Sequence, residues 1–177
     1  MKDALLILDI DGVMTDGTKV YDTEANVIAK RYCDLDFTAI KRFKAVGYKV
    51  CFLSGDSNIN EKMAEKRNID FYHSRTPDGV IDKKSFISIF EDKYKIQKQN
   101  MIYAGDDYFD LDIINELRYT FCPNNSPLIV KDSVFKVLDC RSGQGVVASL
   151  YDYLETIFDF KQVSRKDLDD LDKNERF

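Results

Sequence analysis

Two aspartates follow directly after a short apolar segment near the start of the chain. Residues 4–8 are apolar, and the next residues are Asp9-Ile10-Asp11-Gly12. In an extended chain alternate side chains point to the same side, so both carboxylates would lie together at the end of a buried strand. Because neighbouring like charges repel, keeping both ionised requires a cation. Mg²⁺ prefers such carboxylate sites, with water and a substrate phosphate completing its coordination. The spacing indicates a magnesium and phosphate site, and an exposed acidic turn is the alternative.

Two further apolar segments end in residues that suit the same chemistry. Residues 50–53 lead into Ser54-Gly55, which offers a hydroxyl and a flexible backbone amide that can hold a phosphate oxygen. Residues 101–104 lead into an acidic stretch that contains Asp106. Each segment has the length and composition of a buried strand. We therefore expect more oxygen ligands at these strand ends.

A lysine opens a helical pattern between these two segments. Asp82-Lys83-Lys84 precedes residues 86–90, whose apolar side chains fall on one helical face. The first turn of a helix also presents free backbone amides, so an anion would meet both the lysine and these amides. Lys83 fits the register of this pattern better than Lys84. We predict that Lys83 is a charge partner for the phosphate.

The rest of the chain supplies the elements that must position these residues. In an open parallel sheet, ligands bind beyond the carboxyl ends of the strands, so segments far apart in the chain converge there. We predict an α/β fold with a central parallel sheet and one domain over residues 1–160. The patterns predict strands near residues 4–8, 50–53, 70–73, 101–104, 119–122 and 134–138, and helices near residues 37–46, 58–67, 86–90, 111–117 and 145–158.

The stretch after Gly12 has the pattern of a β-hairpin. Residues 18–21 and 27–30 are candidate strands, and residues 22–26 form a polar turn between them, so the hairpin spans about residues 17–32. Neither this stretch nor the one between Ser54 and Lys83 is long enough for a second domain. The predicted site is therefore uncovered within one chain.

The four motifs, in this order, resemble those of the haloacid dehalogenase (HAD) superfamily of phosphohydrolases, from about residue 5 to residue 154. The resemblance implies a Rossmann-like three-layer sandwich and Mg²⁺-dependent hydrolysis of a phosphomonoester. It implies that Asp9 is the nucleophile that forms an aspartyl-phosphate, and that Asp11 is the general acid and base. Asp9, the backbone carbonyl of Asp11 and the carboxylate of Asp106 would hold the metal.

The same resemblance implies roles for the other motif residues. Ser54 and the Gly55 amide would hold phosphoryl oxygens, and Lys83 would neutralise the nucleophile and the phosphate. Asp107 and Asp110 would tune the metal site or orient Lys83, and a purely structural role is open for both. Phosphoryl transfer depends chiefly on positioning and charge stabilisation. We therefore expect little activity without metal.

A more specific resemblance concerns the absence of a cap domain. Most superfamily members carry a cap over the site, and here the hairpin stands in place of a cap. Residues 9–17, residues 105–110 and the pair Gly143 and Gly145 resemble the capless, tetrameric phosphatases that act on 8- and 9-phosphates of 2-keto-3-deoxy sugar acids. The resemblance implies a sugar phosphate substrate and a homotetramer in which a neighbouring subunit covers the site.

Asp56 separates this chain from one branch of that subfamily. Octulosonate 8-phosphate phosphatases usually carry an arginine directly after the Thr/Ser-Gly of the second motif, and an aspartate cannot pair with the carboxylate of the sugar acid. Nononate 9-phosphate phosphatases place a glutamate there and a lysine about one helix later, a position that Lys66 matches. The resemblance thus slightly favours a nine-carbon acid, with Asp56 on sugar hydroxyls and Lys66 or Arg67 facing the carboxylate. The structural alternative is that Asp56, in competition with Asn58, caps a helix.

Composition excludes several classes of function. The chain has 177 residues, of which 44% are hydrophobic, enough for one core, and its net charge of −5 gives no basic footprint for nucleic acid. No apolar stretch approaches the roughly 18 residues that span a bilayer, and no cleavable signal pattern is present. We expect a cytoplasmic protein. The four cysteines form no C-x-x-C pair and are expected to be reduced thiols, and His73 is expected in packing or at the rim of the site.

Residues 161–177 form a highly charged tail. Such composition is typical of disorder. The alternative is a segment that folds against a neighbouring subunit and offers Arg165 or Lys166 to the substrate.

Two other functions stay open from the sequence. One is a non-catalytic oligomerisation or binding module associated with sugar-nucleotide synthesis, although such a module has no need of all the motif residues. The other is a phosphoprotein phosphatase, although the sequence shows no basic or hydrophobic docking patch.

Overall fold

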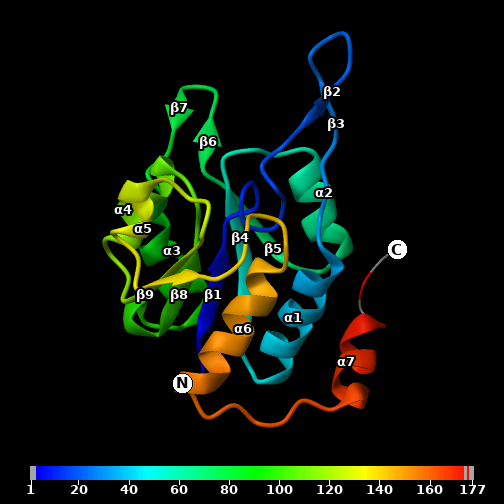
Figure 1. The fold of residues 1–177 in the computed structure, drawn as a ribbon, viewed down its shortest axis with the longest axis vertical. Coiled ribbons are helices and arrows are strands. Elements are labelled where there is room, and N and C mark those ends of the chain that lie inside the picture. The colour runs from blue at the N-terminus through cyan, green and yellow to red at the C-terminus, as the bar shows by residue number, and fades with distance from the viewer. Residues whose placement is uncertain (1–2, 174, 176–177) are drawn as a thin grey trace.

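Six parallel strands form the central sheet, in the order β10-β9-β8-β1-β4-β5 (Figure 1). The structure, a computed structural model, describes residues 3–173 and residue 175. The strands are β1 (Leu5–Leu8), β4 (Lys49–Ser54), β5 (Asp70–His73), β8 (Met101–Ala104), β9 (Tyr119–Pro123) and β10 (Lys136–Leu138). The predicted parallel sheet is confirmed. Its last strand begins later than predicted, because the Phe135 amide donates to the side-chain hydroxyl of Thr120 in β9 instead of to a backbone carbonyl of that strand.

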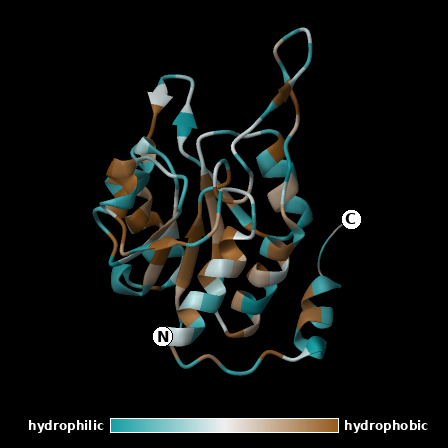
Figure 2. Ribbon diagram, in the orientation of Figure 1, coloured by the Kyte–Doolittle hydropathy of each residue, from teal (hydrophilic) through white to brown (hydrophobic). Residues whose placement is uncertain are grey.

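Helices cover both faces of this sheet and complete three layers. One face carries α1 (Asp34–Ala45), α2 (Ile59–Lys66) and α6 (Val146–Ile157), and the other carries α3 (Phe86–Tyr94), α4 (Leu111–Ile114) and α5 (Leu128–Lys131). Alternation along β1 sends Leu6 and Leu8 into the first core and Leu5 and Ile7 into the second. Because β1 is buried on both faces, it is apolar throughout. Figure 2 shows this concentration of hydrophobic residues on the central strands.

Short elements connect the layers. Three 3₁₀ helices precede longer elements, namely η1 (Lys83–Ser85), η2 (Lys98–Asn100) and η3 (Tyr108–Asp110). The helix pattern that Lys83 opens is thus a 3₁₀ turn followed by α3. The sequence patterns missed the single turn of α5.

Two antiparallel hairpins project beyond the carboxyl ends of the strands (Figure 1). The first is β2 (Val20–Tyr21) and β3 (Val27–Ala29), which confirms the predicted hairpin, and a bridge between Thr15 and Tyr32 closes its base. The second, β6 (Arg75–Thr76) and β7 (Gly79–Val80), was not predicted.

The carboxyl-terminal tail is not disordered throughout, so this expectation is wrong for its central part. Residues Arg165–Asp172 form α7, which begins with a capping box between Ser164 and Asp167. The helix packs against α1 of its own chain, where Lys41 forms an ion pair with Asp172. Figure 1 shows α7 on the outer side of α1, away from the hairpins.

Two expectations about the whole chain can be checked here. All four cysteines are free thiols, as predicted. Among the described residues, no helix combines the length and the apolar character that a membrane crossing requires.

Candidate active site

Most of the predicted site residues gather in one cleft at the carboxyl ends of the central strands. The cleft has a volume of about 460 Å³. Eight of the predicted residues and His73 line it, namely Asp9, Asp11, Ser54, Gly55, Asp56, Lys83, Asp107, Asp110 and His73. They converge because β8, β1 and β4, which end in these motifs, are neighbours in the sheet. His73 lies at the rim, as expected, where its ring nitrogen Nε2 lies 3.2 Å from the Gly55 carbonyl oxygen.

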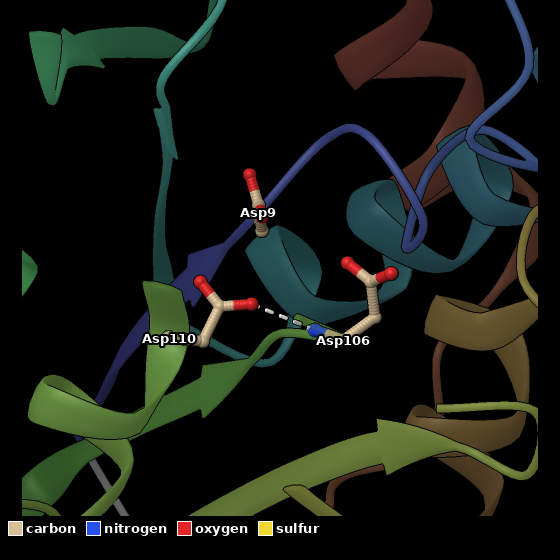
Figure 3. A group of neighbouring side chains, drawn as sticks. All are labelled: Asp9, Asp106 and Asp110. Atoms are coloured by element: carbon tan, nitrogen blue, oxygen red, sulfur yellow. Dashed lines mark hydrogen bonds between the residues drawn. The ribbon is translucent and has the colours of Figure 1, made fainter. Parts of the chain in front are cut away.

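Three carboxylates form the centre of the site. One oxygen from each of Asp9, Asp106 and Asp110 lies within 4.8 Å of the others (Figure 3). Burial raises the pKa of Asp9 to about 7, and burial with the nearby Asp9 and Asp110 charges raises the pKa of Asp106 to about 8. The sequence predicted the carboxylates of Asp9 and Asp106 and the backbone carbonyl of Asp11 as metal ligands. The structure adds the carboxylate of Asp110 to this cluster. These shifts show how strongly the cluster needs positive charge.

Lys83 supplies part of that charge. Its Nζ lies 3.1 Å from Asp9 Oδ2 and 2.6 Å from Asp110 Oδ1. The hydroxyl of Tyr103 also donates to Asp110 Oδ1 at 2.6 Å, and the amides of Asp106 and Asp107 donate to Asp110 Oδ2 at 2.8 and 2.9 Å. Although burial raises the pKa of Asp110, the Lys83 ammonium outweighs it and the pKa is lowered. Both oxygens of Asp110 are therefore occupied, and its geometry is that of a residue that orients Lys83.

The neighbours of these residues have structural contacts. Asp107 Oδ1 accepts the Tyr108 amide at 2.6 Å and caps η3, so Asp107 stabilises the turn that carries Asp110. Lys84 is exposed, and its backbone amide donates to Asp112. Lys83, and not Lys84, is the lysine of the site.

The carboxylates fit a small divalent cation. Asp106 Oδ1 is buried and accepts no hydrogen bond from the described residues. A Cβ atom at Gly12 would lie 1.9 Å from Asp106 Oδ2, so only glycine leaves room for this carboxylate. An unpaired buried oxygen costs free energy unless a ligand satisfies it. The donor set consists of oxygens, as Mg²⁺ requires.

The side chain of Asp11 contacts residues of the first hairpin and of α2. Its Oδ2 lies 2.8 Å from Lys30 Nζ and 3.1 Å from Asn60 Nδ2. Within the described part of the chain, its Oδ1 has only a longer contact, 3.4 Å from the Thr15 hydroxyl. Lys30 and Asn60 were not predicted as site residues. The sequence placed Lys30 at the end of a hairpin strand but gave no sign of which residues it would meet.

Asp56 belongs to the same network. Its Oδ2 lies 2.8 Å from Lys19 Nζ and 2.7 Å from Lys30 Nζ. Although burial raises the pKa of Asp56, the two lysines outweigh this effect and the pKa is lowered. Asn58 occupies the cap position of α2 without a side-chain cap bond, so the alternative that Asp56 caps this helix is wrong. The Asp56 amide and Asn60 Nδ2 each donate to Ser54 Oγ at 3.3 Å, which fixes the hydroxyl expected to bind phosphate.

The two residues expected to face a substrate carboxylate do not reach the cleft of their own chain. Lys66 is exposed at the last residue of α2, away from the end that carries Asn60. Arg67 stacks on Phe37 and pairs with Glu175 at 2.7 Å. The prediction for Lys66 and Arg67 is therefore wrong for a site within one chain. The unpredicted cations that line the cleft are Lys19 and Arg75.

Known proteins resemble this chain over most of its length. No family model matches it. The 3-deoxy-D-manno-octulosonate 8-phosphate phosphatase KdsC of Haemophilus influenzae is 27% identical over 150 residues, which are 84% of this chain and 81% of that protein. The cobalt-bound structure of a deoxy-D-mannose-octulosonate 8-phosphate phosphatase from Haemophilus influenzae has a TM-score of 0.79 at 26% identity and covers 88% of both chains.

A third relative adds a ligand-bound structure. The 3-deoxy-D-manno-octulosonate 8-phosphate phosphatase of Moraxella catarrhalis, in complex with magnesium, phosphate and KDO, has a TM-score of 0.78 at 20% identity and covers 88% of this chain and 87% of that one. At this identity the likeness concerns the fold. With its parallel sheet and the order of its four motifs, the chain has the fold of the haloacid dehalogenase superfamily and is similar to these phosphatases over most of its length.

Proposed function

We propose that this chain hydrolyses the phosphomonoester of a 2-keto-3-deoxy sugar acid through an aspartyl-phosphate on Asp9. The observation that carries the proposal is the buried contact of Lys83 with Asp9, beside the unpaired oxygen of Asp106. A buried ammonium next to a nucleophilic carboxylate suits a phosphate dianion. The named phosphatases among the relatives support the same chemistry.

The chain's own residues account for each proton and bond. An oxygen of Asp9 attacks phosphorus, and the bond from phosphorus to the sugar oxygen breaks. Asp11 donates its proton to the departing alkoxide and later takes a proton from the water that attacks the aspartyl-phosphate. Inorganic phosphate leaves, Asp9 is regenerated, and Asp11 is again protonated.

The metal completes the charge balance. Asp9, Asp106 and the backbone carbonyl of Asp11 would hold Mg²⁺, which when bound offsets the carboxylate charge and withdraws charge from the phosphoryl oxygens. Ser54 and the Gly55 amide would bind phosphoryl oxygens. Lys83 keeps Asp9 oriented through its contact with Asp110.

Within the class of sugar acids, we propose a slight preference for the nine-carbon 9-phosphate over the octulosonate 8-phosphate. The support is Asp56, which stands where octulosonate enzymes usually carry arginine. Lys19 and Lys30 both contact its Oδ2, so Oδ1 would be the oxygen that binds a sugar hydroxyl. The two relatives from Haemophilus influenzae carry octulosonate names and favour the eight-carbon acid instead. Exchange of Asp56 for arginine tests the preference, and an unchanged ratio of kcat/KM for the two acids would contradict it.

We also propose that copies of this chain form a homotetramer that covers the cleft. The support is the hairpin β2–β3, which carries three exposed hydrophobic residues. Val20, Tyr21 and Ile28 have 54, 55 and 58% of their surface exposed. Apolar groups exposed together favour association. Sedimentation equilibrium measures the mass of the assembly, and a monomer at micromolar concentration would contradict this proposal.

Phosphate release from a panel of sugar phosphates tests the function. The panel includes the octulosonate 8-phosphate and nononate 9-phosphate acids, each with Mg²⁺ and with chelator. We expect turnover of a keto-sugar acid with Mg²⁺ only, and loss of turnover in Asp9→Asn. The control is Asp92→Asn, an exposed aspartate on α3 outside the cleft. A folded protein that binds Mg²⁺ but hydrolyses no member of the panel would overturn the proposal.

A further inference from the structure

We infer that Lys30 is a positioning residue for the general acid, because it fixes the carboxylate of Asp11 and ties it to the hairpin β2–β3. The inference rests on the proposed function, since it concerns the residue that protonates the leaving group. Nothing in the motif order points to Lys30, which follows β3 directly.

The contacts of Lys30 are unusually complete for a lysine beside a surface hairpin. Its Nζ lies 2.8 Å from Asp11 Oδ2, 2.7 Å from Asp56 Oδ2 and 2.9 Å from Asn60 Oδ1. An ammonium has three donors, and these three acceptors use all of them. Only 1% of the side chain is exposed. A lysine buried to this extent is costly unless its charge is paired, so the network is a single unit.

Asn60 fixes the same network through hydrogen bonds of both its side-chain oxygen and its side-chain nitrogen. Its Oδ1 accepts from Lys30 and from the Tyr32 hydroxyl at 3.0 Å, which leaves Nδ2 as the donor to Asp11 Oδ2 at 3.1 Å. Two donors therefore hold one oxygen of Asp11. Among the described residues, the other oxygen, Oδ1, has only the 3.4 Å contact with Thr15, so it is the one available for proton transfer.

This arrangement has a chemical consequence. A general acid must present its proton to the leaving oxygen in one orientation, and a carboxylate free to rotate does so only part of the time. Without Lys30, Oδ2 of Asp11 loses one of its two donors. Once Asp11 has given up its proton, its carboxylate would also face that of Asp56 with no shared cation, and repulsion would turn it away. Removal of Lys30 should therefore lower the rate strongly for an alkoxide leaving group, which needs a proton. It should lower the rate little for p-nitrophenolate, which departs without one.

The experiment compares two substrates in the full-length protein with Mg²⁺. In Lys30→Met we expect kcat/KM for the keto-sugar phosphate to fall at least about tenfold, as befits a disturbed general acid, and kcat/KM for p-nitrophenyl phosphate to change less than about threefold. Lys30→Arg should recover part of the loss. The control is Lys41→Met, which removes another mostly buried, ion-paired lysine with 13% of its side chain exposed, far from the cleft. An equal loss on both substrates would overturn the inference.

A double-variant cycle separates this inference from the proposed function. If Lys30 acts through Asp11, then Asp11→Asn with Lys30→Met is no slower on the sugar phosphate than Asp11→Asn alone, whereas independent roles give additive losses and contradict the inference. If the natural chain hydrolyses no phosphate, the proposed function fails. The same cycle then measures the coupling free energy between Lys30 and Asp11 in urea unfolding. A coupling free energy within error of zero overturns the inference, and a clear coupling supports the positioning contact.

Discussion

The backbone of Gly12 lies directly against the carboxylate of Asp106. A Cβ at position 12 would stand 1.9 Å from Asp106 Oδ2, and Gly12 has a φ of +92°, a conformation that side chains disfavour. The first and last motifs of the site are thus in van der Waals contact through a position with no side chain.

Replacement of Gly12 by alanine should displace Asp106 and weaken metal binding. We expect the apparent affinity for Mg²⁺, measured by isothermal titration calorimetry, to fall at least about tenfold, because a metal ligand moves out of place. Gly47→Ala is a matched control, since Gly47 has a φ of +98° but nothing within 4 Å of its added Cβ. Equal metal affinity in the two variants would show that backbone strain, and not the contact with Asp106, explains any loss.

Lys83→Met should destabilise the fold as well as the site. Its removal leaves the buried carboxylates of Asp9 and Asp110 without their shared cation, and breaking such a buried pair costs about 3–5 kcal/mol. Lys84→Met, at the exposed next position, should change the free energy of unfolding by less than about 0.5 kcal/mol. Urea unfolding at pH 7 without metal measures both. A loss below about 1 kcal/mol in Lys83→Met would contradict the buried ion pair.

Mg²⁺ should raise the melting temperature through Asp106. A ligand that binds only the native state stabilises it, by about 2.7 kcal/mol at a hundredfold excess over Kd. We expect Asp106→Asn to abolish this rise and Asp92→Asn to retain it, in thermal unfolding with Mg²⁺ and with chelator. A full rise in Asp106→Asn would mean that the cation binds elsewhere.

Asp36 should make stability depend on pH in an uncommon direction. It is fully buried beside the start of α6, where Oδ1 accepts the amides of Val147 and Ala148 at 2.7 and 3.1 Å. Burial raises its pKa from 3.8 to about 6. A raised carboxyl pKa means that the folded state holds the proton more tightly, so the stabilising contribution is present below about pH 4 and is lost as pH rises toward 6.

The measurement is the difference in unfolding free energy between Asp36→Asn and the natural chain. We expect this difference to shift in favour of Asp36→Asn by on the order of 2–3 kcal/mol between pH 4 and pH 7. Asp132→Asn, at an exposed position, is the control. A difference that is independent of pH, or that shifts in favour of the natural chain, would contradict the assignment.

Much of the site could be predicted because its residues lie at the ends of short apolar strands. Asp9, Ser54 and Asp106 each follow such a segment, and parallel strands bring their carboxyl ends together whatever the connections are. Tyr103 was missed, although a buried tyrosine hydroxyl needs a partner and so marked β8 as more than core.

The errors have physical reasons that the chain alone does not display. Lys66 was placed by its distance along the sequence, but α2 rises about 1.5 Å per residue and carries Lys66 away from the end that holds Asn60. The contacts of Lys30 depend on where the hairpin lies relative to α2, and tertiary packing determines that position. The hairpin β6–β7 did leave a signal, since Pro77-Asp78-Gly79 is a typical turn sequence. In α7 the spacing of Leu168 and Leu171 favoured a helix, but the surrounding charges obscured it.

The position of Asp9 and Asp106 in the sheet affects how easily the site opens by local unfolding. Asp9 and Asp106 follow β1 and β8, interior strands whose amides should exchange with solvent only upon global unfolding, whereas the two-stranded hairpin belongs to the part of the fold that opens most easily. We therefore expect the nucleophile to rest on a slowly exchanging part of the molecule and the restraint on Asp11 to come from a faster-exchanging part. Mild warming should therefore erode leaving-group protonation long before it disturbs the nucleophile.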